Sequence, residues 1–151
     1  MSASTQPFRR DQGGLIDRNR PLSFRFDGRS HQGFEGDTLA SALLANDQML
    51  VGRSFKYHRP RGIVGSGPEE PNALLNLGQG ARLEPNQRAT TTELFDGLVS
   101  ASQNHWPSLE YDVGVVNNYV ARVLGSRRAP DLSSTSALGS SGPAERMPRG
   151  R

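Results

Sequence analysis

The stretch LSFRFDGRSHQGF, residues 22–34, decides the fold that the sequence predicts. Its first apolar residues alternate with polar ones, at Leu22, Phe24 and Phe26, as in a strand with one buried face. The pair Asp27-Gly28 follows, and such a pair favours a type I′ turn, in which both central residues need a positive φ. We therefore expect a β-hairpin whose return strand covers residues 29–34.

A short helix is predicted immediately after this hairpin. Asp37 and Thr38 carry side-chain oxygens that can accept hydrogen bonds from the free amides of a first helical turn. The apolar residues behind them have helical spacing, at Leu39, Ala40, Ala42, Leu43 and Leu44. A lone hairpin and a helix this short are both unstable in isolation, so we expect them to pack against each other.

The remaining segments predict a small α+β fold. Residues 63–71 are rich in Gly, Pro and Glu and predict a loop; strands are expected at 72–77 and 88–92. A turn of helix is expected within residues 93–102, and a second helix over 112–124. A tight opening hairpin is an antiparallel connection, which disfavours a doubly wound parallel sheet and favours a mixed sheet packed on one main helix.

The predicted organisation is a flexible arm over residues 1–20, a folded domain over 21–110, a helix or linker over 111–124, and a low-complexity tail over 125–151. In that tail 18 of 27 residues are Ser, Gly, Pro or Arg, which predicts disorder. The tail also carries the whole net charge of +3, because residues 1–124 hold 13 basic and 13 acidic residues. Basic charge confined to such a tail is weak support for nucleic-acid binding, which we do not expect.

Composition narrows the possible chemistry further. The 151 residues include no cysteine, which excludes disulfides, thiolate zinc sites, cysteine nucleophiles and clusters ligated by cysteine. His31, His58 and His105 match no metal-binding spacing, and no catalytic set assembles. No apolar run approaches the roughly 20 residues of a membrane span, and the first residues lack a secretory signal pattern. A cytoplasmic protein without membrane contact is expected.

One basic segment, residues 53–61, is a candidate binding site. It alternates cationic side chains with Phe55 and Tyr57, the cations being Arg53, Lys56, His58, Arg59 and Arg61. Three interpretations remain open: an anion site for a phosphate or carboxylate, a docking edge for an acidic partner, or a solvated strand. In the third, the aromatics would fill the core and the arginines would pair with Glu69, Glu70 or Glu84.

Five segments of the sequence are distinctive: GDTLASALLAN (36–46), VGRSFKYHRPRGI (51–63), EEPNALL (69–75), EPNQRATT (84–91) and SQNHWPSLEYDVGVVN (102–117). Taken in this order, they resemble the start of the alpha subunit of heterotetrameric sarcosine oxidase. The resemblance covers about residues 14–120 and implies a β-grasp domain similar to plant-type [2Fe–2S] ferredoxins. Relatives with a cluster carry four cysteines, and these positions fall here on Gly65, Glu70, Ala73 and Thr90. The resemblance therefore implies a ferredoxin-like scaffold that has lost its cluster.

The resemblance also implies a parent activity, the oxidative demethylation of sarcosine to glycine with FAD, FMN and NAD. Those cofactors would lie in other segments of the alpha subunit or in the beta, gamma and delta subunits, and none is expected in these residues. We expect a non-catalytic assembly domain, in a truncated or frame-shifted product, with the basic segment at an interface to those partners. The alternative is an independent small module that binds a nucleotide or an acidic partner through the same segment.

Overall fold

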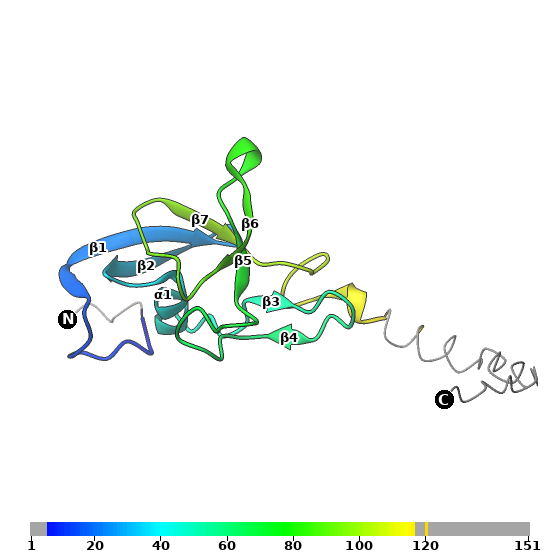
Figure 1. Ribbon diagram of the computed structural model, residues 1–151, viewed down its shortest axis with the longest axis horizontal. Coiled ribbons are helices and arrows are strands. Elements are labelled where there is room, and N and C mark those ends of the chain that lie inside the picture. The colour runs from blue at the N-terminus through cyan, green and yellow to red at the C-terminus, as the bar shows by residue number, and fades with distance from the viewer. Residues whose placement is uncertain (1–5, 117–119, 121–151) are drawn as a thin grey trace, which may run out of the picture.

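The computed structural model describes residues 6–116 and residue 120. Within them, a mixed sheet has the order β2-β1-β7-β5-β6, with β1 (Asp17–Phe26), β2 (Arg29–Glu35), β5 (Leu74–Leu77), β6 (Glu84–Arg88) and β7 (Leu98–Ala101). β1 and β7 are parallel, and the other neighbours in this sheet are antiparallel. The helix α1 (Leu39–Ala45) packs against the sheet (Figure 1). This is the predicted α+β, β-grasp architecture.

The opening hairpin forms as predicted. Phe26 pairs with Arg29, and the two turn residues Asp27 and Gly28 have φ of 47° and 80°, as a type I′ turn requires. β1 begins at Asp17, however, and a register irregularity separates Asp17 from Pro21. The predicted domain boundary at residue 21 therefore falls inside a strand. Asp17 pairs with Glu35. Residues 17–20 lie at the surface and carry no apolar alternation, so the sequence pattern did not predict this part of the strand.

The helix α1 begins at the predicted cap. Thr38 Oγ1 accepts from the Ser41 amide at 3.2 Å, and Ser41 Oγ accepts from the Thr38 amide at 3.0 Å, which completes a capping box. Two further amides of the first turn donate to carbonyls of another segment, Leu39 to Thr92 at 2.8 Å and Ala40 to Ala89 at 2.9 Å. The chain around residues 89–92 is therefore held against the start of α1.

The core lies between α1 and the sheet. Its fully buried large side chains come from both layers and from the adjoining loops, namely Phe24, Phe26, Leu39, Leu43, Val51 and Leu75. Gly33 on β2 permits the close approach, because a Cβ there would lie 2.3 Å from Leu94 Cδ2 and 3.2 Å from Ala42 Cβ.

Two predictions of secondary structure were wrong. The strand expected at 88–92 is β6, Glu84–Arg88, after which the chain turns towards α1. The helical turn expected within 93–102 is β7, Leu98–Ala101, which lies between β1 and β5. Leu94 and Leu98 are both buried, and their spacing of four suggested a helix. They reach the core from a loop and from a strand instead.

A second, two-stranded sheet joins β3 (Gly52–Arg53) to β4 (Pro60–Arg61). Two short 3-10 turns, η1 (Gly80–Arg82) and η2 (Val113–Val115), complete the elements. η2 marks the beginning of the predicted helix over 112–124, most of which lies outside the described residues, as does the predicted tail. None of the described helices has the length and apolar character that crossing a bilayer requires.

Candidate functional site

The loop between β4 and β5, residues 64–73, carries a buried carboxylate and is named here the Glu70 loop. The Glu70 side chain is fully buried. One oxygen, Oε2, accepts from the amides of Val64, at 2.7 Å, and Gly65. The other, Oε1, accepts from the amides of Asn72, at 2.7 Å, and Ala73, at 3.2 Å. Four backbone amides of one loop therefore converge on one side chain.

These amides determine the charge state of Glu70. Burial by itself would raise the pKa of the carboxyl group, but the backbone hydrogen bonds outweigh burial and hold the pKa below its ordinary value of 4.5. The side chain is therefore a carboxylate at neutral pH. Among the described residues no arginine or lysine forms an ion pair with Glu70. The negative charge of Glu70 is stabilised by the four backbone N–H groups that donate to it.

The structure brings the four predicted cluster positions together around this loop. Gly65, Glu70 and Ala73 meet at the Glu70 carboxylate, as described above. Thr90 Oγ1 donates to the Gly67 carbonyl at 2.7 Å, and the neighbouring Ala89 amide donates to the Ala73 carbonyl at 2.9 Å. These side chains supply one carboxylate, one engaged hydroxyl and no thiolate, so they do not fit a [2Fe–2S] cluster. No metal-binding group of three or more His, Cys, Asp or Glu occurs in the described part of the chain.

The basic segment does not gather its cations into one site. The Arg53 guanidinium donates to the carbonyls of Leu109, Glu110 and His58. Arg61 donates to the Asn72 side chain. Both guanidinium groups are thus engaged by the protein itself and hold neighbouring loops in place.

Lys56 and Arg59 lie at the exposed tip of the β3–β4 hairpin. The Lys56 Nζ lies 5.3 Å and the Arg59 Cζ 5.2 Å from the centre of the Tyr57 ring, within cation–π range. Phe55 is 85% exposed and Tyr57 43% exposed. The interpretation in which these aromatics fill the core is therefore wrong, because the chain turns at residues 54–58 and the predicted alternation ends there.

His58 ties this hairpin to the segment that follows β7. Its Nδ1 lies 2.7 Å from Asp112 Oδ2, and the Asp112 side chain is fully shielded from solvent. Asp112 Oδ1 also accepts from the amides of Trp106 and Gly114. Burial would raise the pKa of Asp112, but these hydrogen bonds and His58 hold it below its ordinary value of 3.8. One carboxylate thus joins three segments.

The hairpin tip and the segment after β7 lie at the same end of the molecule (Figure 1). We name this exposed region the tip surface. It contains aromatic, aliphatic and basic side chains, namely Phe55, Lys56, Tyr57, Arg59, Trp106, Tyr111 and Val113. Exposed aromatic side chains close to cations are typical of surfaces that bind other proteins.

The other two histidines also have structural surroundings. The His31 ring stacks on Phe24 with ring centres 5.5 Å apart, and burial, with the nearby Arg29 charge, lowers its pKa. His105 Nδ1 lies 3.0 Å from Ser102 Oγ, which in turn donates to Asp27 at 2.6 Å. In a nucleophilic triad the histidine lies between the serine and the carboxylate, whereas here the Ser102 hydroxyl is hydrogen-bonded directly to the Asp27 carboxylate. These three residues therefore do not form such a triad.

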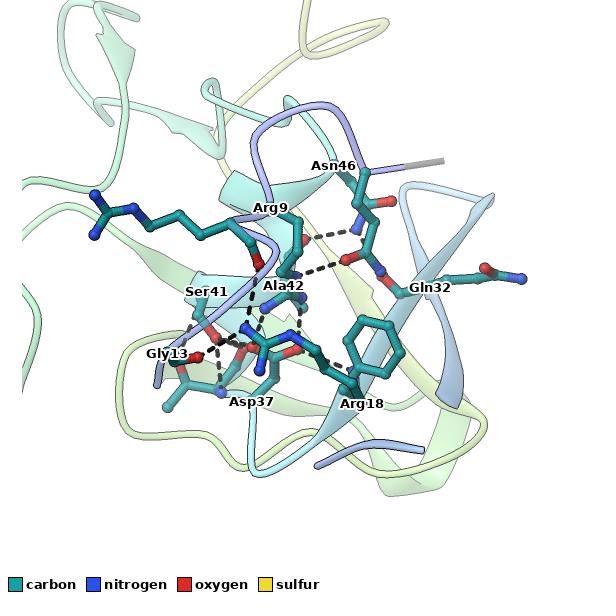
Figure 2. Close-up of polar contacts among 12 residues, drawn as sticks. Arg9, Gly13, Arg18, Gln32, Asp37, Ser41, Ala42 and Asn46 are labelled. Carbon is teal, nitrogen blue, oxygen red and sulfur yellow. Dashed lines mark hydrogen bonds and ion pairs between the residues drawn. The ribbon is translucent and has the colours of Figure 1, made fainter. Parts of the chain in front are cut away.

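The sequence did not reveal how the N-terminal segment is held. Figure 2 shows Arg9 donating to both oxygens of Asp37, which is buried and also accepts from Ser41 Oγ. Arg18 donates to the Gly13 carbonyl at 2.7 Å in the same region. The described part of the predicted arm is thus attached to the domain. No local pattern marks an ion pair between residues so distant in sequence.

A mixed sheet that packs on one helix, with a tight loop of converging amides beside it, defines a ferredoxin-like β-grasp domain. The chain belongs to the family described as "2Fe-2S iron-sulfur cluster binding domain", which it matches over residues 19–105. Its curated relatives are sarcosine oxidase alpha subunits. It is 62% identical to that of Rhizobium meliloti (strain 1021) over 119 residues, 79% of this chain and 12% of the relative.

More distant relatives are also sarcosine oxidase alpha subunits. That of Corynebacterium sp. (strain U-96) is 43% identical over 57% of this chain and 9% of its own length, and that of strain P-1 is 45% identical over 51% and 8%. The chain therefore spans about a tenth of the length of these relatives. Among solved structures, L-proline dehydrogenase from P. horikoshii aligns with a TM-score of 0.45 and 23% identity, over 60% of this chain and 17% of that one.

Proposed function

We propose that this chain is an N-terminal structural domain of a sarcosine oxidase alpha subunit and contributes to assembly of the enzyme. The observation that carries the proposal is the 62% identity over 119 residues to one such subunit. No group in this domain is assigned to the reaction. The oxidative demethylation of sarcosine, and the FAD, FMN and NAD that it needs, would belong to other segments and to the beta, gamma and delta subunits.

The tip surface is proposed as the contact with those partners. Phe55 is 85%, Trp106 70% and Tyr111 82% exposed, which is unusual for large apolar side chains gathered in one region. Val116, the last residue before the undescribed segment, is also exposed. In the proposed assignment the rest of the alpha subunit would follow this segment, and the tip surface would lie next to the point where the subunit continues.

A co-purification experiment tests this role. The tagged chain is co-expressed with the remaining alpha region and the other subunits of the Rhizobium meliloti enzyme, and the recovered subunits are quantified. We expect F55S combined with R59E to reduce recovery at least tenfold, because the pair removes an apolar anchor and reverses a charge. Phe95 is also exposed, at 56%, but the nearby residues Leu94 and Gly97 are hydrogen-bonded to Asp37 and Ser23 and not to the hairpin. F95S is therefore the matched control.

The outcome decides between assembly and independence. Unchanged recovery with F55S/R59E would remove the tip surface from the interface. No recovery with the unaltered chain would remove the assembly role altogether.

The alternative, an independent module for a nucleotide or acidic ligand, receives less support from the geometry. Such a site needs several free cations in one place, whereas Arg53 and Arg61 are engaged by protein carbonyl and amide oxygens. Submicromolar nucleotide binding by the chain alone, measured by calorimetry, would favour the module.

A further inference from the structure

The Glu70 loop has the construction of an anion-binding cradle. Beyond the four amides bound to Glu70, the next two, of Ser66 and Gly67, donate to Glu69 Oε1 at 3.1 and 2.9 Å. Thus four consecutive amides, from residue 64 to residue 67, all face carboxylates. Concave arrangements of successive backbone amides bind anions, including phosphates and iron–sulfur clusters.

The anion inside this cradle is supplied by the chain itself. Glu70 is buried, whereas Glu69 is exposed and lies at the rim. A Cβ built on Gly65 would lie 3.3 Å from Glu70 Oε2 and 3.2 Å from Glu69 Oε1. The space that a side chain at position 65 would enter is therefore the space next to these carboxylates. A side chain at position 65 would therefore require these carboxylates to move by a few tenths of an ångström.

We propose that the Glu70 carboxylate is the fixed anion of this cradle, and that shortening it opens a site for a free small carboxylate. Formate or acetate has the charge and the two acceptor oxygens that the four amides require. The inference concerns the loop alone and does not depend on which subunits the domain contacts.

The first experiment separates the charge of Glu70 from its shape. Thermal unfolding of the full 151-residue chain is followed by circular dichroism for E70Q, E70A and the matched controls E69Q and E69A. The amide group of E70Q fills the same space but turns an NH₂ donor towards two backbone donors. We expect E70Q to lower the Tm by on the order of 10 °C, while E69Q changes it by about 2 °C or less.

The second experiment fills the opened cradle. We expect about 100 mM formate to raise the Tm of E70A by about 5 °C relative to the same concentration of chloride, and to leave the unaltered chain and E69A unchanged. A Tm for E70Q equal to that of the unaltered chain, or no formate-specific rise for E70A, would overturn the proposal.

A third measurement uses the unaltered chain, so it remains informative if E70A does not fold. In a pH titration followed by NMR, the amide signals of Val64, Gly65, Asn72 and Ala73 should shift together with one midpoint as Glu70 takes up a proton. Independent midpoints, or signals that do not move, would contradict a single shared carboxylate.

Discussion

The guanidinium of Arg9 and the carboxylate of Asp37 form two parallel hydrogen bonds, of 2.8 and 2.6 Å, across 28 residues of sequence. The Asp37 side chain is 1% exposed and that of Arg9 14% exposed, so the pair is largely removed from water. The same carboxylate accepts from the Phe34 amide and from Ser41 Oγ. One side chain thus holds the N-terminal segment, the end of β2 and the first turn of α1.

Loss of Arg9 should therefore be costly. R9A leaves Asp37 buried without its charge partner, and removing one member of such a pair commonly costs about 3–5 kcal/mol of unfolding free energy. We expect a loss of about 3 kcal/mol, measured by urea unfolding. The exposed neighbour Arg10 provides the control, because R10A should change stability by about 0.5 kcal/mol or less. Equal stability of the two variants would contradict the importance of the pair.

Stability should fall in acid. The pKa values of Asp37, Glu70 and Asp112 are lowered in the folded chain from ordinary values of 3.8, 4.5 and 3.8. Between the folded and unfolded pKa values the unfolded chain binds more protons, so these groups stabilise the fold above the ordinary values. That stabilisation is lost as pH falls below about 4.5 through the folded pKa values.

Urea unfolding between pH 7 and pH 3 measures this dependence. The curve for E70Q should be flatter than that of the unaltered chain, because position 70 then no longer titrates. Parallel curves for the two proteins would show that the pKa of Glu70 is the same in the folded and unfolded chains.

A larger residue at position 33 should destabilise the fold. G33A places a methyl group 2.3 Å from Leu94 Cδ2 and 3.2 Å from Ala42 Cβ, between β2 and the core side of α1. Overpacking of this kind commonly costs about 1–3 kcal/mol, and we expect a loss in that range by urea unfolding. G52A is the control, because the nearest atom to its Cβ is 3.9 Å away. If G33A proved as stable as G52A, the Leu94 side chain would have to move aside without cost, which would contradict a tightly packed contact at this position.

The contact between Gly114 and His58 offers a test of the tip surface. A Cβ on residue 114 would lie 2.4 Å from the His58 ring, which Asp112 holds in place at 2.7 Å. G114A should therefore displace His58 and speed the exchange of the Trp106 and Gly114-region amides with deuterium, without altering the core. In an H58A background the same substitution should have little further effect. Additive effects of the two substitutions would contradict the contact.

The local elements were the easier part to predict. The hairpin and α1 depend on neighbouring residues: alternation in β1, the Asp27-Gly28 turn, and the Thr38 cap. β7 was missed because Leu94 and Leu98 have the spacing of a helix. Leu94 lies in a loop and Leu98 in β7, and both side chains are buried in the core. The exposed strand β6 was placed too late, because its residues carry no buried face to mark it.

The candidate sites also combine features that the sequence predicts with features that depend on the folded chain. The basic segment was recognised as a run of cations, but only the folded chain separates the engaged Arg53 and Arg61 from the exposed Lys56 and Arg59. The resemblance makes Glu70 a degenerate ligand position, and one interpretation of the basic segment makes it an ion-pair partner of an arginine, but neither predicts a buried anion. Its burial depends on amides from both ends of the loop, which residue type alone does not report.

Residue order by itself determined the opening hairpin, the cap of the following helix and the absence of any thiolate ligand, because each depends on neighbouring residues or on composition. The tertiary structure decided which charges are buried. Asp37 and Asp112 are hydrogen-bonded to residues that are distant in the sequence, Arg9 and His58. Glu70 accepts hydrogen bonds from backbone amides that no sequence pattern identifies. Desolvation and hydrogen bonding act through space, so the state of these carboxylates became visible only in the folded chain.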